Sequence, residues 1–286
     1  MVIILMVVCA LLKMAEGALI KKYNSKHSEG GFIFSGIVTL FAMLFFVFTD
    51  KNSLEFPPLV WFFGIAAGVC YFSATIFTYM ALGCGSFALT MMILSYAMIL
   101  SIIYGIAFLK EPLTLFTCIG IILVLISIYF IRAENKEKTV KKSITPFWIL
   151  AMVISVFTNG FVGILTKMQQ VSLKDAYSNE FMIVCLGFST VTLLTVGAFK
   201  ERGKVFYILK NGGIYAAMAG LSNGAKNLFN LIAQMIIPVS LLAPLGAGIN
   251  NLVTFLFAFF VFKEKLSKKQ IIGALLGTLA LVLFNM

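Results

Sequence analysis

Charged side chains are scarce in this sequence. Asp, Glu, Lys and Arg make up 12% of the 286 residues, whereas hydrophobic residues make up 61%. Because a soluble globular protein is about a quarter charged, the composition excludes an ordinary soluble fold. Apolar runs of about 20 residues recur along the chain, and each is long enough to cross a bilayer as a helix. We therefore predict an all-α, multi-pass protein of the cell membrane, surrounded by the lipid bilayer.

Signatures of catalysis and of metal binding are missing as well. The single histidine, His27, lies in a polar loop, and the five cysteines lie in apolar runs without Cys-x-x-Cys spacing. The phosphate-binding pattern G-x-x-x-x-G-K-[ST] and the hydrolase pattern H-E-x-x-H do not occur, which argues against an ATP-driven pump and against zinc hydrolases of that kind. The pattern G-x-S-x-G occurs once, at Gly220–Gly224, inside an apolar run and not at the strand-to-helix turn that a hydrolase needs. We expect a protein that is not an enzyme and has no metal or cofactor. A membrane-embedded enzyme is the weaker alternative.

The basic residues lie mostly in short loops between the apolar runs. The net charge of +11 therefore forms no basic patch with interleaved aromatics, and we expect no nucleic-acid partner. Odd-numbered loops hold 16 of the 22 Lys and Arg residues, and even-numbered loops hold four. The positive-inside rule then predicts that the odd-numbered loops face the cytoplasm and that both termini lie outside.

The apolar runs predict ten transmembrane helices. The longest polar stretch, residues 132–145, lies near the middle of the chain and is typical of a linker. The expected helices cover about residues 2–20, 31–48, 59–80, 86–108, 113–131, 146–166, 180–199, 213–236, 238–262 and 267–284.

A short phrase occurs twice, as FLKEPLT at Phe108–Thr114 and as VFKEKLS at Val261–Ser267. When the chain is shifted by 153 residues, residues 108–131 lie on 261–284 and six of these 24 positions are identical, including the Lys-Glu pair and a glycine. The position of this pair in both hairpins indicates an internal duplication. We predict a first five-helix repeat at 1–131, the linker at 132–145 and a second five-helix repeat at 146–286. An odd number of helices per repeat makes the repeats inverted, an architecture that secondary transporters use with the solute near the midplane.

The Lys-Glu pair inside each copy, at Lys110–Glu111 and Lys263–Glu264, lies at an expected hairpin at the lipid boundary. We favour the interpretation that these pairs anchor helix ends at the lipid headgroups over a direct contact with a solute.

With ten spans, a five-span duplication and KEPLT and KEKLS before the last span of each half, the chain resembles the drug/metabolite transporter superfamily, specifically its EamA-type ten-helix branch. The resemblance implies secondary active transport of a small polar or amphipathic metabolite such as an amino acid, often by export. It also implies a small-molecule solute and, as a candidate coupling ion, protons. A lipid-carrier flippase and a cationic-drug exporter of the same superfamily are the alternatives. In the four-helix small multidrug resistance relatives, a Glu in the first helix exchanges protons. Glu16 is the candidate for that role here, although Lys21 and Lys22 follow it more closely than in those relatives.

Three charged residues lie well inside the expected spans: Lys13, Glu16 and Lys226. Each costs about 2.5–3.5 kcal/mol at a helix centre on insertion scales, so each should pair, face water or bind something. Lys13 and Glu16 are three residues apart and share a helix face.

The eighth expected span carries a polar stripe that cannot face lipid, because unpaired hydrogen-bonding groups there cost several kcal/mol each. At 100° per residue, five polar residues of this span fall on one face, namely Asn223, Lys226, Asn227, Asn230 and Gln234. Either these groups bond to neighbouring helices and Lys226 pairs with Glu16, or the stripe lines a solute cavity. We favour the cavity because five polar groups exceed what helix association needs.

Our hypothesis is that Lys226 binds a solute carboxylate and that Glu16 binds the solute amine or a coupling proton. Tyr71, Tyr79 and Tyr96 form cavity walls or pack between helices. The predicted binding residues are Lys13, Glu16, Asn159, Asn223, Lys226, Asn227, Asn230 and Gln234.

Two features bear on the shape of the bundle. Pro244 and the nearby Gly246 and Gly248 suggest that the ninth span is broken or kinked, as a transport site or as a packing feature. The pair Gly273 and Gly277 indicates close helix packing within the monomer or a dimer contact, so we expect a monomer or a homodimer.

Overall fold

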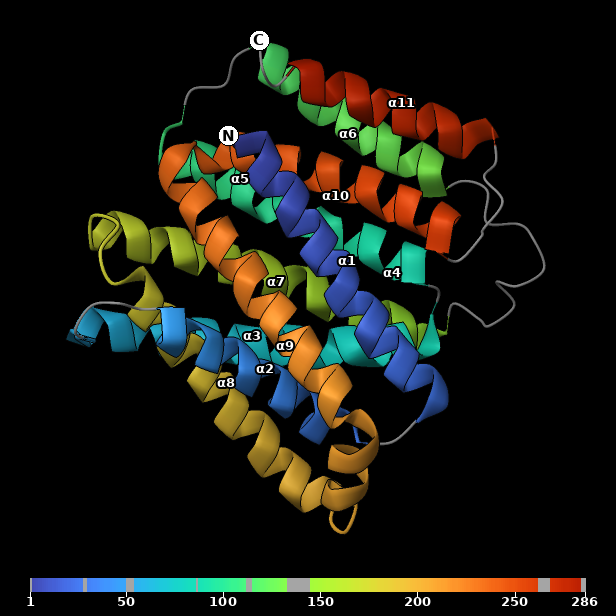
Figure 1. Ribbon diagram of the computed structural model, residues 1–286. Coiled ribbons are helices and arrows are strands. Elements are labelled where there is room, and N and C mark those ends of the chain that lie inside the picture. The colour runs from blue at the N-terminus through green and yellow to red at the C-terminus, as the bar shows by residue number, and fades with distance from the viewer. Residues whose placement is uncertain are drawn as a thin grey trace.

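The structure is a bundle of helices (Figure 1). It is a computed structural model and describes residues 2–27, 30–49, 54–85, 87–111, 115–132, 145–261 and 268–283. Within these ranges every regular element is a helix, as the apolar composition predicts. The proposed linker lies almost wholly outside the described residues, as do Lys263 and Glu264.

The helices fall into two sets that flank the linker. The first set comprises α1 (Val2–Lys26), α2 (Gly31–Thr49), α3 (Pro58–Cys84), α4 (Phe87–Leu94), the short 3₁₀ turn η1 (Ser95–Ala97), α5 (Met98–Ala107) and α6 (Leu115–Arg132). The second set comprises α7 (Pro146–Ser172), α8 (Ser178–Lys200), α9 (Val205–Ile236), α10 (Val239–Val261) and α11 (Lys268–Leu283).

Local sequence explains several helix boundaries. Proline at the first helical position needs no backbone N–H partner, and both α3 and α7 begin with it. The side chain of Thr145 also accepts a hydrogen bond from Trp148 N, so it caps the start of α7. Gly85 ends α3, with its N–H bonded to Ala81 O. These signals set the ends of long helices whose interiors are almost entirely apolar.

The helix contacts have the symmetry of an inverted duplication. α1 packs on α9 and α7 packs on α3, so the first helix of each repeat contacts the third helix of the other. The remaining counterparts contact each other directly: α2 packs on α8, α5 on α10, and α6 on α11. This pattern is unchanged when the two repeats are exchanged. The chain therefore folds as two interlocked, inverted five-span repeats.

Small residues let helices of opposite repeats approach closely. A side chain at Gly220 of α9 would clash with the backbone of α2 at Val38 O, and one at Gly68 of α3 would crowd Cys185 O of α8. Gly277 of α11 faces Ser127 of α6 in the same chain. Close packing at small residues is how membrane helices gain dispersion energy without a hydrophobic driving force.

Large apolar side chains cover the outside of the bundle, among them Trp61, Phe62 and Phe206, which are 50%, 67% and 78% exposed. Five of the described helices, α1, α2, α3, α7 and α8, are long and apolar enough to cross a membrane by length and composition. An exterior of this kind suits contact with lipid rather than water.

The fourth span differs from the sequence prediction, and the ninth decides between two alternatives. We predicted one continuous helix at 86–108, but the 3₁₀ turn η1 separates α4 from α5. The ninth span, for which we predicted a break or a kink near Pro244, is a continuous helix from Val239 to Val261 and is therefore not broken. Because Pro244 lies only five residues after the start of α10, the backbone hydrogen bond that it removes is near the beginning of the helix and the helix is not divided.

Candidate functional site

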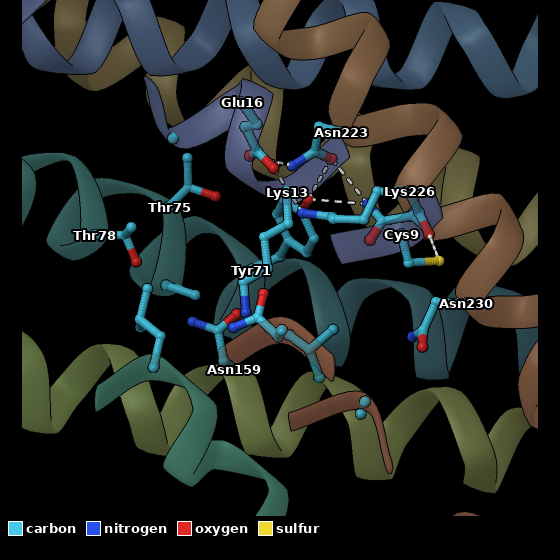
Figure 2. Close-up of a pocket in the computed structure, with 18 of the residues that line it drawn as sticks. Cys9, Lys13, Glu16, Tyr71, Thr75, Thr78, Asn159, Asn223, Lys226 and Asn230 are labelled. Atoms are coloured by element: carbon cyan, nitrogen blue, oxygen red, sulfur yellow. Dashed lines mark hydrogen bonds and ion pairs between the residues drawn. The ribbon is translucent and has the colours of Figure 1, made fainter. Parts of the chain in front are cut away.

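A cavity of about 320 Å³ lies inside the bundle, mainly between α1, α3, α7, α9 and α10. Tyr71 and Asn159 are the central residues of α3 and α7, and Lys13 is next to the centre of α1, so the cavity lies about halfway along these helices. Figure 2 shows its polar side chains converging from several helices. The lining residues with polar side chains are Cys9, Lys13, Glu16, Tyr71, Thr75, Thr78, Asn159, Thr166, Asn223, Lys226, Asn227, Asn230 and Asn250.

An ion pair joins the two repeats at this cavity. Lys226 Nζ donates to Glu16 Oε2 at 2.8 Å, and the two side chains are 20% and 14% exposed. Asn223 Nδ2 donates to the other carboxylate oxygen, Oε1, at 2.6 Å. Both oxygens of Glu16 therefore have a partner on α9, and the carboxylate is held in one place by a charged and a neutral donor.

Tyr71 extends this network to α3. Its hydroxyl donates to Asn223 Oδ1 at 2.6 Å and accepts from Asn227 Nδ2 at 3.1 Å. Asn227 Nδ2 also lies 2.8 Å from Asn223 Oδ1. One connected set of hydrogen bonds thus crosses three helices and joins Glu16, Asn223, Lys226, Asn227 and Tyr71. Figure 2 shows Glu16, Asn223 and Lys226 of this set close together.

Two cavity residues stand outside this network. Lys13 lines the cavity on the same face of α1 as Glu16, yet within the described part of the chain its ammonium makes no hydrogen bond or ion pair. Asn230, one turn beyond Lys226 on α9, likewise has no side-chain partner among the described residues (Figure 2). The cavity thus offers one ammonium and one amide that no described residue engages.

Two further asparagines of the lining are bonded outside this network. Asn159 Nδ2 donates to Ser155 O of its own helix at 2.8 Å. Asn250 Nδ2 donates to Ser95 Oγ in the η1 turn at 2.9 Å, whereas its Oδ1 accepts no hydrogen bond from the described residues. Asn250 therefore connects α10 to the 3₁₀ turn of the fourth span.

The cavity carries an excess of positive charge. Its charged lining residues are Lys13, Lys226 and Glu16, which sum to +1 when all are ionised. Among the described residues, no three His, Cys, Asp or Glu side chains come together as metal ligands would. The network therefore neutralises one of the two lysines and leaves the other without a counter-charge among the described lining residues.

Seven of the eight predicted binding residues line the cavity, and Gln234 does not. Gln234 lies near the end of α9, where its backbone carbonyl accepts from Lys167 Nζ at 2.8 Å. Of the three tyrosines considered, Tyr71 lines the cavity and Tyr79 and Tyr96 do not. The pairing of Lys226 with Glu16, which we had set as the alternative to a solute-binding stripe, occurs in the same stripe that lines the cavity.

Sequence analysis missed several lining residues, namely Cys9, Thr75, Thr78 and Thr166. A threonine or cysteine in an apolar run gives little signal, because its side chain can bond to the preceding turn of its own helix. Thr166 Oγ1, for instance, donates to Val162 O at 2.8 Å. Thr75 and Thr78 share a helix face with Tyr71, and that spacing was the available clue.

The model of the EamA-like transporter family matches the chain twice, over residues 1–133 and 146–286. Among solved structures, 28 chains match. One is the crystal structure of a protein 14% identical in sequence, with a TM-score of 0.69 over 99% of this chain and 95% of that one. At this identity the likeness concerns the fold alone. No curated protein matches the chain.

Proposed function

The chain belongs to the EamA-like transporter family, and from this premise we propose that it exports a small carboxylate-bearing metabolite, such as an amino acid, by alternating access. The cavity between the repeats is the proposed binding site. The observation that carries this proposal is the unpaired ammonium of Lys13 in a cavity whose other charges already satisfy each other.

The size and position of the cavity support a small solute. Ligand pockets for drug-sized molecules range from about 300 to 1,000 Å³, and this cavity of about 320 Å³ is at the lower end of that range. Transporters built from inverted repeats bind solutes near the midplane, at the interface of the repeats. The walls of this cavity come from both repeats and from the middle of α1, α3 and α7.

Two ammonium groups compete for a solute carboxylate, and the cost of freeing each one decides between them. Lys226 is bonded to Glu16, and separating a buried ion pair costs about 3–5 kcal/mol. Lys13 has no partner to lose within the described residues. We therefore assign the carboxylate to Lys13, where we had expected Lys226, and leave Lys226 to hold Glu16 in place.

The rest of the solute then faces neutral groups. Among the described residues, Asn230 has no side-chain partner and the side-chain oxygen of Asn159 accepts no hydrogen bond. Amide and hydroxyl groups can both donate and accept hydrogen bonds, so they suit the amine or hydroxyl of a polar metabolite. A cationic drug lacks the group that would match Lys13, and the formal charge of +1 opposes its entry.

Glu16 is the proposed site of the coupling proton. Its carboxylate is the one acidic group among the described lining residues, and it is bonded to Lys226 and Asn223. Protonation would weaken the bond to Lys226 and leave that ammonium short of a counter-charge, which favours a rearrangement of α9 against α1. This is how a proton could be exchanged for the solute in each cycle.

The proposal is tested with the purified protein reconstituted in lipid vesicles. The panel contains the 20 amino acids, their methyl esters, which lack the carboxylate, and tetraphenylphosphonium as a cationic drug. We expect at least one amino acid to move and its methyl ester to move at least tenfold more slowly. Movement of tetraphenylphosphonium without movement of any amino acid would overturn the assigned substrate class in favour of a cationic-drug exporter.

A pH-sensitive dye inside the same vesicles tests the coupling. Export of the amino acid should be accompanied by proton movement in the opposite direction, and a proton gradient alone should drive accumulation. In Glu16→Gln we expect the proton movement to disappear. An unchanged proton flux in this variant would rule out Glu16 as the coupling site.

A further inference from the structure

Two lysines fasten helix ends at equivalent places in the two repeats. Lys21, near the end of α1, donates to Leu82 O and Gly85 O, each at 2.6 Å, at the end of α3. Lys167, near the end of α7, donates to Gln234 O at 2.8 Å, at the end of α9. In both cases an ammonium binds backbone carbonyls that the last turn of a helix leaves without an intrahelical partner.

The correspondence of these lysines is visible in the sequence. A shift of 146 residues places GALIK, at 17–21, on GILTK, at 163–167, so that Gly, Leu and Lys coincide. Both segments lie in the first helix of their repeat. The two contacts are therefore the same contact, made once in each inverted repeat.

A carboxylate completes the junction between α9 and α10. Glu111 Oε1 accepts from Val239 N at 3.1 Å and Glu111 Oε2 accepts from Ser240 N at 2.7 Å, at the start of α10. A negative charge at a helix N-terminus and a positive charge at a helix C-terminus both interact favourably with the helix dipole and stabilise the helix. Glu111 is thus a helix cap from the opposite repeat, and not the headgroup anchor that the sequence suggested.

The two junctions lie at opposite ends of the bundle. Figure 1 shows α4 beginning at one end and α10 beginning at the other. The cavity lies between them, and the capped helices α3, α9 and α10 contribute to its walls. From the distribution of loop lysines, the Lys21 contact faces the cytoplasm, and the Lys167 and Glu111 contacts face outward.

We propose that Lys21 on the inner side, and Lys167 with Glu111 on the outer side, are positioning residues that act as two gates to the cavity. Each gate closes when its charged side chain binds a helix end and opens when that contact breaks. The inference rests on the transport function proposed above. Alternating access requires that the two gates do not open together, and the contacts of both gates are formed in this structure.

The chemistry of these contacts suits a gate. A hydrogen bond between a charged side chain and a helix end is directional, so it defines a closed position. When the contact breaks, the ammonium or carboxylate and the backbone groups can each bind water at the membrane surface instead. An apolar contact has no such replacement when it opens to water. The contact can therefore form and break in every cycle without leaving an unsatisfied buried group.

Cys9 provides a reporter, because it lines the cavity. In a protein whose other four cysteines are changed to alanine, its reaction with a membrane-impermeant thiol reagent is measured from each face of oriented vesicles. For Lys21→Met we expect the ratio of inside to outside labelling rates to rise at least fivefold. For Lys167→Met and Glu111→Gln we expect it to fall by a similar factor.

Matched controls come from lysines near the same helix ends. Lys26 and Lys174 are exposed, and their side chains bond to no helix end among the described residues, so Lys26→Met and Lys174→Met should leave the ratio unchanged. Lys21→Arg and Lys167→Arg keep the positive charge, so the labelling ratio of these variants should stay close to that of the parent protein. A ratio that stays constant in all three gate variants contradicts the proposal. A ratio that shifts in the same direction for the inner and the outer variants also contradicts it, and so does fast labelling from both faces, as a damaged protein would show.

The labelling needs no solute, so its outcome is separate from that of the transport assay. If the ratio shifts as expected while no amino acid moves in vesicles, the gates stand and the proposed substrate class fails. If amino acids move and the ratio stays constant, the substrate class stands and the gates fail.

Discussion

The two walls of the cavity are equivalent in architecture and different in charge. One wall consists of α1 packed on α9, and the other of α3 packed on α7, so each combines one helix from each repeat. All three charged lining residues lie on the first wall, whereas the second contributes a tyrosine, three threonines and one asparagine, namely Tyr71, Thr75, Thr78, Asn159 and Thr166. Exchange of the repeats would place the charged wall on the neutral one.

The first helices of the two repeats show where they differ. At the shift of 146 residues that superposes GALIK on GILTK, Lys13 falls on Asn159 and Glu16 falls on Val162. The framework that fastens the helix ends is thus repeated, and the charges that face the cavity are not. A symmetric fold can therefore hold an asymmetric solute, with its charged end toward α1 and its neutral end toward α7.

The largest expected effect comes from breaking the ion pair on the charged wall. Lys226→Met leaves Glu16 without its counter-charge, which costs about 3–5 kcal/mol. We expect a marked fall in thermal stability in detergent and a fall in transport of at least about 100-fold, given that 1.4 kcal/mol corresponds to about tenfold.

The double variant Glu16→Gln with Lys226→Met is the matched control, because it removes both charges. We expect it to regain stability and to remain inactive. A single variant as stable as the parent protein would show that the pair is unimportant to the fold.

The next largest effect concerns the unpaired cation on the same wall. Lys13→Gln removes the proposed carboxylate partner, and hydrogen bonds to charged groups contribute about 1.5–3 kcal/mol, or about 10–100-fold in affinity. We expect that loss for the transported amino acid with no loss of thermal stability, because Lys13 has no partner in the described structure. Lys13→Arg should retain most of the activity. Equal losses in Gln and Arg variants would point to a requirement for size and not for charge.

On the neutral wall the effects should be smaller. Tyr71→Phe removes a hydroxyl that bonds to Asn223 and Asn227, and each neutral hydrogen bond contributes about 0.5–1.5 kcal/mol. We expect transport to fall by about tenfold. Tyr79→Phe is the control on the same helix, because the Tyr79 hydroxyl is buried without a partner among the described residues, and it should behave as the parent does. Similar losses in both variants would contradict the role of the network.

The smallest effect is expected at Thr78, also on the neutral wall. Its hydroxyl lies 3.4 Å from Ser155 Oγ, which is long for a hydrogen bond between hydroxyl groups. Thr78→Val keeps the shape, so we expect transport within about threefold of the parent, equivalent to less than about 0.7 kcal/mol. A loss as large as that of Lys13→Gln would mean that the neutral wall selects the solute as strongly as the charged one.

Helical periodicity located most of the charged wall in advance. The stripe of Asn223, Lys226, Asn227 and Asn230 was predicted from spacing alone, because polar groups on one face of a membrane helix must turn inward. The same spacing included Gln234, which lies beyond the cavity. Periodicity identifies a face of a helix and carries no information on how far along that face the cavity extends.

The contacts between helices could not be predicted from the sequence. Glu16 and Lys226 are 210 residues apart, and nothing in either helix alone states that α1 packs on α9. For the same reason the repeated Lys-Glu phrase could be recognised, but the bond from Glu111 to the start of α10, 129 residues away at Ser240, could not be predicted. The 3₁₀ turn η1 was not predicted because Ser95 and its neighbours include no glycine or proline.

Protection of Cys9 by the solute tests the central claim most directly, because Cys9 lies in the cavity beside the charged wall. The rate at which a thiol reagent modifies Cys9, in the protein that retains this cysteine alone, is measured with increasing concentrations of the transported amino acid and of its methyl ester. The account predicts saturable slowing by the amino acid in the protein with Lys13, little slowing by the ester, and neither effect in Lys13→Gln. Equal protection by the amino acid and its ester, or protection that persists in Lys13→Gln, would contradict it.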